Sequence, residues 1–310
     1  MKKSRIKKGL KIAFWLIFVL GGLFVALVPP SHTPPTSVTV KVQQPPADIV
    51  LAEPPVTGGE EASAVTGGET VTVPVAPVEK ETPLPKGLRP KIAIVIDDVG
   101  LDIKGSEKAI KLPATVTLSF LPYAMRLREQ TKAARDAGHE LLLHMPMQPI
   151  GHEDPGPGAL VVDLPMRDLQ QRFEDALASF AGFDGVNNHM GSKFTAYADG
   201  MTMVMDELQQ RHLFFFDSRT SAQSVGKKIA QEKGLPTVSR DVFLDDDQTP
   251  DAIRSQLEAT ERVARHKGYA VAIGHPHAAT MDVLMAWTKE ADKRGFDLVP
   301  LHDLVKQADR

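Results

Sequence analysis

The chain has 310 residues, no cysteine and a formal net charge of −3 at pH 7. The lack of cysteine excludes disulfides, thiolate metal sites and cysteine nucleophiles, so any metal ligands must be histidines and carboxylates. A nearly neutral chain without interleaved basic and aromatic residues lacks the features of a nucleic-acid-binding protein, and we expect no nucleic-acid partner.

The N-terminus combines a basic flank with an apolar segment. Residues 1–11 hold six lysines and arginines, and residues 12–28 hold no charged side chain. A helix over the apolar segment spans roughly 26 Å at ~1.5 Å per residue, at the short end of what crosses a bilayer. Because the positive charges flank only one side, the N-terminus is expected to stay in the cytoplasm.

We therefore expect 12–28 to be an uncleaved transmembrane signal anchor in the cytoplasmic membrane. The C-terminal domain would then lie outside the cytoplasm, in the periplasm or at the extracellular surface. A cleaved signal peptide is the alternative interpretation. It is disfavoured because residues 26–29, Ala-Leu-Val-Pro, match the small-residue pattern of a cleavage site poorly.

A proline-rich segment follows. Residues 29–90 contain thirteen prolines and repeat the sequence Val-Thr-Gly-Gly-Glu at 56–60 and 65–69. Proline fixes φ and removes backbone donors, and the segment has too few large apolar residues to close a core. It is predicted to be a disordered linker that holds the domain formed by residues 91–310 away from the membrane surface.

Within 91–310, short apolar runs alternate with amphipathic segments. This alternation is typical of a parallel sheet covered by helices and predicts the α/β class. The expected strands are 92–96, 115–120, 140–143, 185–188, 213–216, 242–244, 270–273 and 297–299. The expected helices are 104–111, 125–137, 166–180, 199–210, 250–267 and 280–294. With so many strands in 220 residues, a (β/α) barrel is the first interpretation and an open doubly wound sheet is the second.

Polar side chains follow nearly every expected strand. In a (β/α) barrel the C-terminal strand ends meet on one face, where the active site lies. Six strands that end in Asp, His or Asn are therefore more informative than a single one would be. The residues concerned are Asp97-Asp98, Ser119, His144, Asn187-Asn188-His189, Asp217-Ser218-Arg219, Asp241 or Asp245, and His275-Pro276-His277.

The pair Asp97 and Asp98 directly follows the apolar run 92–96. Two adjacent carboxylates repel each other, so a pair at the end of a buried strand needs a cation or a shared proton. A helix cap would account for one aspartate but not for two. We interpret the pair as the centre of a functional site.

Histidines supply the other candidate ligands. His144 ends the third expected strand, and His189 lies in a loop of small and polar residues that allows a ligand to approach closely. His139 and His144 are five positions apart, whereas the zinc-protease helix motif needs four, so that motif is excluded. His139 is predicted to be a surface or loop residue after Gly138.

The remaining polar residues have simpler alternatives. Asp217 is interpreted either as a cap or as a partner of Arg219. His275 and His277 flank a proline, and one of them is expected in the site. The three aspartates at 245–247 are interpreted as a solvated acidic turn.

In order and spacing, these residues resemble the motifs of the NodB-type polysaccharide deacetylases, and more specifically their divergent branch. The resemblance covers essentially all of 91–310 and implies an irregular (β/α) barrel with a divalent metal, usually zinc. It depends on the segments Val95–Asp98, Gly138–His144, His144–Gln148, Asn187–Ser192, Phe215–Arg219, Arg240–Asp245 and Ala270–His277.

The resemblance also implies roles for single residues. Asp97 would be the catalytic base, Asp98 and His144 would be metal ligands, and His275 would be the general acid.

Two positions depart from the family pattern. The second metal histidine falls on Gln148, a far weaker ligand for zinc, and residues 187–189 replace an expected arginine-proline motif. We predict that His189 supplies the missing imidazole, which gives three protein ligands and an open position for water. Further candidates for the site are Gln148 itself, Asn188, Asp217, Arg219 and His277.

The resemblance implies a metal-dependent carbohydrate N-deacetylase that acts on a cell-envelope glycan, either a polysaccharide or peptidoglycan. One alternative is a catalytically eroded barrel that binds glycan or protein. Another is a metal-dependent hydrolase of a different amide or ester. Asp97 favours the enzyme, because a binding module needs no base, whereas the missing arginine favours the module.

Overall fold

The computed structural model describes residues 88–308. The predicted basic flank (1–11), the signal anchor (12–28) and the linker up to residue 87 lie outside the described residues. Within 88–308, no helix is both long enough and apolar enough to cross a membrane. At the start of this region, Arg89 forms ion pairs with Asp292 and Asp297, so the last residues of the predicted linker contact the domain.

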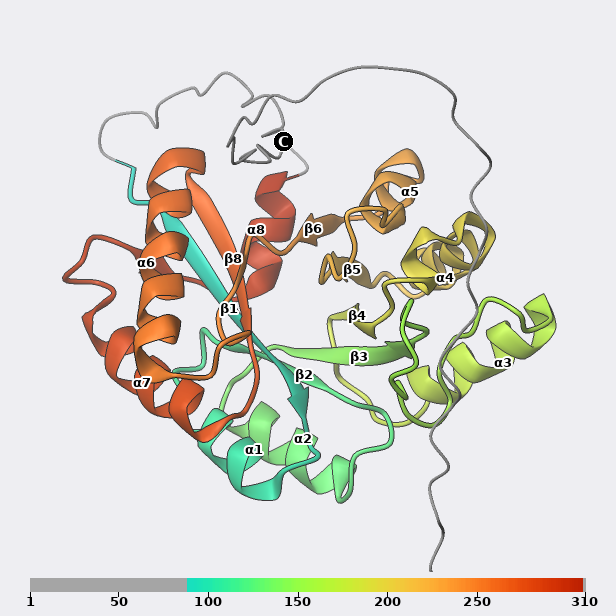
Figure 1. Cartoon of the computed structure of the whole chain (residues 1–310), viewed down its shortest axis with the longest axis horizontal. Coiled ribbons are helices and arrows are strands. Elements are labelled where there is room, and N and C mark those ends of the chain that lie inside the picture. The colour runs from blue at the N-terminus through green and yellow to red at the C-terminus, as the bar shows by residue number, and fades with distance from the viewer. Residues whose placement is uncertain (1–87, 309–310) are drawn as a thin grey trace, which may run out of the picture. The chain divides into compact units, whose positions relative to one another are not determined.

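Parallel strands and covering helices alternate along the described chain (Figure 1). The strands are β1 (Lys91–Val99), β2 (Thr117–Phe120), β3 (Leu141–Met147), β4 (Gly185–Met190), β5 (Phe214–Asp217), β6 (Thr237–Ser239), β7 (Val242–Phe243), β8 (Tyr269–Gly274) and β9 (Asp297–Leu298). The helices are α1 (Ile103–Ala109), α2 (Leu127–Asp136), α3 (Met166–Leu177), α4 (Ala198–Gln210), α5 (Gly226–Glu232), α6 (Pro250–Lys267), α7 (Ala278–Glu290) and α8 (Leu301–Ala308), with a 3₁₀ turn at Phe194–Ala196. The strand order is β6-β5-β4-β3-β2-β1-β8-β7, with β9 beside the start of β1, and the strand pairs are parallel. The expected α/β class is confirmed.

The sheet curls into a half-barrel whose two edges are joined by one stretch of chain. β6 pairs with β5 and β7 pairs with β8, and only Arg240 and Asp241 separate them. The Arg240 N–H donates to the carbonyl of Asp217 at 3.0 Å, and the Asp241 N–H donates to the carbonyl of Val271 at 2.8 Å. The sheet thus has an open, irregular form of the expected barrel.

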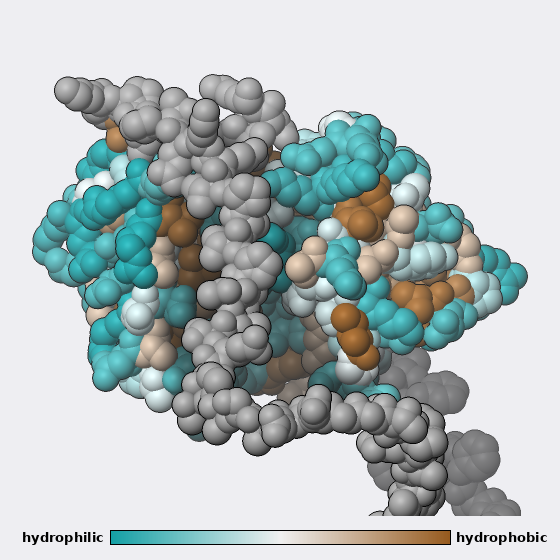
Figure 2. All heavy atoms as spheres, turned by 45° about the horizontal axis from the view of Figure 1, so that its top comes forward, coloured by the Kyte–Doolittle hydropathy of each residue, from teal (hydrophilic) through white to brown (hydrophobic). Residues whose placement is uncertain are grey.

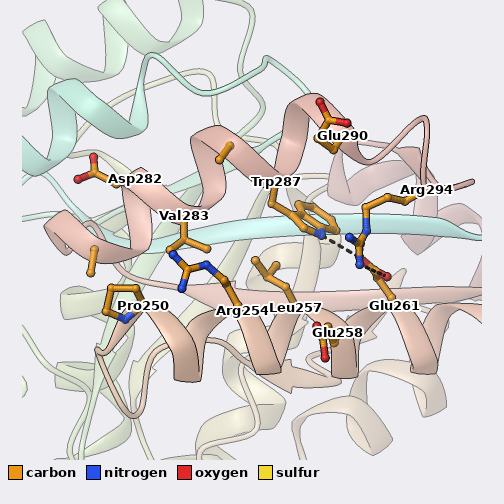
Figure 3. Close-up of a pocket in the computed structure, with 12 residues that line it drawn as sticks. Pro250, Arg254, Leu257, Glu258, Glu261, Asp282, Val283, Trp287, Glu290 and Arg294 are labelled. Carbon is orange, nitrogen blue, oxygen red and sulfur yellow. Dashed lines mark hydrogen bonds and ion pairs between the residues drawn. The ribbon is translucent and has the colours of Figure 1, made fainter.

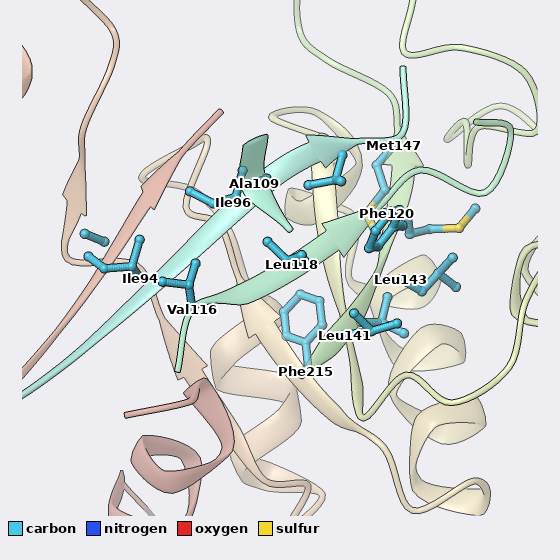
Figure 4. Packing of buried hydrophobic residues seen from close by; sticks show 14 of the residues in the cluster. Ile94, Ile96, Ala109, Val116, Leu118, Phe120, Leu141, Leu143, Met147 and Phe215 are labelled. Carbon is cyan, nitrogen blue, oxygen red and sulfur yellow. The ribbon is translucent and has the colours of Figure 1, made fainter. Parts of the chain in front are cut away.

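Alternate residues of β1 face opposite sides of the sheet, as a period of two requires. Ile94 and Ile96 pack toward the covering helices in the larger hydrophobic cluster (Figure 4). Ala93 and Val95 belong to a second cluster on the inner side of the curl. Asp97 continues this inward-facing series. The second cluster also contains the α8 residues Leu301, Leu304 and Val305.

Helix α8 closes the N-terminal end of the curl. The Thr117 hydroxyl accepts a hydrogen bond from the Leu301 N–H at 3.1 Å and donates one to Glu140 at 2.8 Å. Glu140 also accepts from the N–H of His302 at 3.2 Å. These bonds satisfy N–H groups in the first turn of α8 that have no partner within the helix. The C-terminal strand ends are left for the site.

Three short elements and one histidine differ from the expectation. The sequence pattern does not predict β6, α5 or α8, because elements of three to eight residues offer few positions in which a period can be recognised. His139 lies in the loop between α2 and β3, as one of the two expected placements has it, but it is not at the surface, since its exposed fraction is 2%. Its ring nitrogens lie 2.7 Å and 3.0 Å from the carbonyl oxygens of Val116 and Ile110. Buried carbonyls at these strand and helix ends need donors, which the imidazole can supply.

On the face shown in Figure 2, hydrophilic residues dominate the described part, and hydrophobic residues form separate patches. The large hydrophobic side chains that are exposed are Leu88, Leu101, Met125, Ile150 and Met166. They are scattered along the sequence, and single apolar residues on a protein surface are common.

Candidate metal and catalytic centre

Three strand ends bring the predicted metal ligands together at the C-terminal side of the curl. Asp98 lies on β1, His144 on β3 and His189 on β4. Asp98 Oδ1 lies 3.2 Å from His144 Nε2 and 2.8 Å from His189 Nδ1. One potential ligand atom from each of the three residues lies within 4.8 Å of the other two.

A bulge in β1 brings both aspartates to the same side of the strand. Successive strand residues normally point to opposite faces. The pairing of β1 with β2 shifts register between Ile96 and Val99, and Asp98 has a φ of +56°. His144 Nε2 consequently lies 3.7 Å from Asp97 Oδ2 as well as close to Asp98. A left-handed backbone is unfavourable for a residue with a Cβ atom, and such strain is concentrated at functional sites.

The donor atoms fit a divalent cation. Asp98 Oδ1 is buried and accepts no hydrogen bond of normal geometry, although two imidazole nitrogens lie close to it. Three atoms that carry lone pairs therefore converge on one small space. Two imidazoles and one carboxylate form a ligand set that zinc accepts while keeping a fourth position open for water.

Asn187 on β4 orients both the cluster and Asp97. Its Nδ2 donates to Asp97 Oδ1 at 2.9 Å. Since a carboxylate can only accept, the amide oxygen of Asn187 faces His144 Nδ1 at 2.9 Å and accepts from the Ser119 hydroxyl at 2.5 Å. His144 Nδ1 therefore carries the proton, and the Nε2 lone pair is directed at the cluster. No separate role for Asn187 is predicted from the sequence, since its position at a strand end is the only signal that it offers.

The two adjacent carboxylates differ in basicity. Burial raises the pKa of Asp97 above its ordinary value, against the influence of the nearby histidines. Burial has the same tendency at Asp98, but contacts with His144 and His189 outweigh it and hold the pKa of that carboxyl well below its usual range. This contrast in pKa suits one aspartate to hold a cation and the other to take up a proton.

His275 borders the cluster, with its Nε2 4.0 Å from Asp98 Oδ2. Its Nδ1 lies 2.9 Å from Asp245 Oδ1, and its backbone N–H donates to Asp245 Oδ2 at 2.6 Å. Burial opposes the charged imidazole, but the Asp245 carboxylate outweighs burial and raises the pKa of His275 to about 9.

The interpretation of 245–247 as a solvated turn was wrong for its first residue. Asp245 has an exposed fraction of 3%, whereas Asp246 and Asp247 are exposed. The chain leaves β7 beside the end of β8, so the first carboxylate meets the His275 ring and the Thr280 hydroxyl, which donates to it at 2.9 Å. The spacing along the sequence could not show this contact.

Two further candidates fix the loops around the site. Gln148 Oε1 accepts a hydrogen bond from the Val162 N–H at 3.0 Å, and Gln148 is not part of the ligand cluster. Asn188 Oδ1 accepts from the N–H of Ser218 at 3.0 Å, while its Nδ2 donates to the carbonyl of Met190 at 2.7 Å. Both side chains bind backbone groups of neighbouring segments.

Asp217 and His277 lie beside the site. The Asp217 carboxylate accepts from the backbone N–H of Arg219 and from the Ser224 hydroxyl, both at 2.8 Å. It thus stabilises the turn after β5 and does not cap α5, whose N-cap is Val225. His277 lies just before α7, with its ring 5.9 Å from that of His275. His277 could complete a second cluster with Asp245 and His275.

A groove of about 650 Å³ between α6 and α7 is separate from this centre (Figure 3). Trp287 Nε1 and Arg294 Nε both donate to Glu261 on its floor, at 2.9 Å and 2.7 Å. None of the predicted site residues lines this groove.

Comparisons with known proteins place the chain in a family. Residues 94–305 match the model of the divergent polysaccharide deacetylases. An uncharacterized protein from Haemophilus influenzae is 39% identical over 196 residues, which cover 63% of this chain and 70% of that protein. The uncharacterized protein YibQ from Escherichia coli is 36% identical over 194 residues, which cover 63% of this chain and 61% of that protein.

A solved structure resembles the domain as well. The crystal structure of the uncharacterized protein ATU2773 from Agrobacterium tumefaciens has a TM-score of 0.69 and 32% identity, covering 72% of this chain and 92% of that one. The sequence match spans β1 to α8 and thus includes every strand end that contributes to the centre. The chain belongs to the divergent polysaccharide deacetylase family.

Proposed function

We propose that this chain is a metal-dependent carbohydrate N-deacetylase that acts on a glycan of the cell envelope, anchored to the cytoplasmic membrane through residues 12–28. The observation that supports it most is the convergence of Asp98, His144 and His189. Asp97 and His275 border this cluster, as a base and an acid must border the bond that breaks.

A divalent metal such as zinc, held by the three ligands, would polarise the acetamide carbonyl and lower the pKa of a water molecule. Asp97 accepts a proton from that water as the water oxygen attacks the acetyl carbon. The bond between carbon and nitrogen then breaks, and His275 Nε2 donates its proton to the departing nitrogen. The products are acetate and a free amino sugar.

The electrostatics of the chain suit these roles. A raised pKa makes Asp97 a stronger base than an exposed aspartate, while the Asn187 amide keeps its carboxylate in place. A pKa of about 9 keeps His275 protonated at neutral pH, with the proton on Nε2 available because Nδ1 is bound to Asp245.

Acetate release from N-acetylated amino-sugar oligomers tests the proposal. The full chain in detergent is expected to release acetate, to lose this activity with a chelator, and to regain it when zinc is added. Glycan binding without acetate release, with metal bound, would instead identify the eroded binding module. Two features favour that second candidate: Gln148 stands where the family pattern has a histidine, and the expected arginine is missing.

Asp245→Asn is expected to move the basic limb of the kcat/KM profile to lower pH. Activity requires protonated His275, whose pKa of about 9 depends on the Asp245 carboxylate. Without that charge the pKa of His275 falls toward the ordinary imidazole value of about 6.5, so activity disappears as pH rises through that value. Asp246→Asn, in the exposed part of the same turn, should keep the wild-type limb. An unchanged limb in Asp245→Asn would refute the role of His275 as the acid.

A further inference from the structure

Two arginines lie beside the centre and have no role in the mechanism above. A pocket of about 570 Å³ is lined by Arg219, Arg240 and Phe243, among others. The Phe243 ring lies 5.2 Å from the ring of His275, between centroids. The pocket therefore adjoins the residue that is proposed to protonate the leaving amine.

Arg240 is fixed in this pocket by contacts on several sides. Its Nε donates to the carbonyl of Ser218 at 2.7 Å, and its Nη2 donates to the carbonyl of Arg219 at 2.8 Å. Its guanidinium carbon lies 5.2 Å from the centroid of the Phe243 ring. Burial, and then the charge of Arg219, lowers the pKa of Arg240. Arg240 thus binds the backbone of Arg219, which carries the second cation of the pocket.

Arg219 has a fixed backbone and an uncommitted side chain. Its N–H donates to the buried Asp217 carboxylate at 2.8 Å, and its φ is +49°, which is unusual for a residue with a Cβ atom. Within residues 88–308, the Arg219 guanidinium forms no hydrogen bond and no ion pair. The exposed Arg219 side chain thus leaves its guanidinium available to a ligand in the pocket that it lines together with Arg240.

In the described part of the chain, the two aspartates that line the pocket, Asp241 and Asp246, form no ion pair with either arginine. Asp241 is bound by Lys267 Nζ at 2.8 Å and by the N–H of Val271 at 3.0 Å. Asp246 is exposed and forms no ion pair with either arginine. Within the described residues, neither guanidinium is therefore ion-paired with a carboxylate, which leaves both available to an anionic ligand.

We propose that Arg219 and Arg240 form a subsite for the carboxylate of a sugar next to the residue that is deacetylated. The planar guanidinium of Arg219 can bind a carboxylate with two parallel hydrogen bonds. The substrate is then an acidic glycan, whose carboxylate belongs to a uronic acid or to a lactyl ether on an amino sugar. This inference depends on the proposed function for the substrate, but the subsite can be tested by binding alone.

The test measures binding by calorimetry to the full chain carrying Asp97→Asn, which removes the proposed base. The first probe is an oligosaccharide of alternating N-acetylglucosamine and glucuronic acid, compared with the same oligosaccharide after reduction of its carboxylates to alcohols. The second pair uses alternating N-acetylglucosamine and N-acetylmuramic acid in the same two forms. At least one pair should show about tenfold or more tighter binding of the acidic form, the size expected for a charge-assisted hydrogen bond. The pair that shows it identifies the source of the carboxylate.

Variants show which side chain causes the preference for the acidic oligosaccharide. Arg219→Gln should reduce the preference for the acidic form to less than about threefold, and Arg219→Lys, which keeps the charge but not the fork, should retain part of it. Arg262→Gln, an exposed arginine on α6, should keep the full preference. Equal binding of acidic and reduced forms in both pairs, or a preference that survives Arg219→Gln, would overturn the subsite. Failure of acetate release in the separate assay would overturn the proposed function without changing this result.

Discussion

Asp97→Asn is expected to lower kcat by about 10² to 10⁴, the contribution typical of a positioned general base. The carbonyl oxygen of asparagine can still accept the hydrogen bond from Asn187, which now reaches Asp97 Oδ1 at 2.9 Å, so the local structure should persist. What the variant loses is a basic oxygen whose pKa burial raises. The measurement is acetate release at saturating oligosaccharide, together with the zinc content of the same preparation.

The zinc content of Asp97→Asn distinguishes the loss of a catalytic base from the loss of the metal site. Asp97 is not part of the cluster of potential ligands, so the zinc content should stay near that of the wild type. Asp163→Asn, whose side chain is 83% exposed, provides a matched control and should keep full activity. Full acetate release by Asp97→Asn would remove Asp97 from the mechanism, and loss of zinc would make it a ligand instead.

His189→Ala is expected to weaken zinc binding by more than about 100-fold, since loss of a supporting partner of a ligand alone costs about 10- to 100-fold. His189 Nδ1 lies 2.8 Å from Asp98 Oδ1, and its removal leaves two protein ligands in the cluster. Gln148→Ala is the informative comparison, because the family resemblance predicts the second metal histidine at the position of Gln148. Its side chain binds the Val162 N–H, so Gln148→Ala should retain its zinc.

Zinc affinity measured by competition with a chromophoric chelator checks this pair, and circular dichroism establishes that both variants are folded. Equal loss of zinc from both variants would mean that Gln148 takes part in metal binding after a rearrangement of its loop. Retention of zinc by His189→Ala would mean that a residue other than His189 supplies the third metal ligand.

Much of the fold could be predicted from the sequence, because it depends on local patterns. The strand before Asp97 is buried on both faces of the sheet, so its sequence is a continuous apolar run. Such a run predicts a strand of a parallel sheet. The cap at Thr249, followed by Pro250 and ended by Gly268, defines α6 at both ends, since these signals lie within one or two residues of the helix termini. Short elements such as β6 lack such signals and depend on their neighbours in the sheet.

The sequence by itself determined the α/β class, the family and the chemical types at the strand ends, since these depend on periodicity and on ordered motifs. It also predicted Asp98, His144 and His189 as one ligand set, and the structure brings these three side chains close together. Only the tertiary structure decided how Asn187 bridges Asp97 and His144, and that Asp245 holds His275. Asn187 is 90 positions from Asp97, and Asp245 is 30 positions from His275. The physical reason is that such hydrogen bonds join separate strands and turns, and the curl of the sheet alone sets which of them meet.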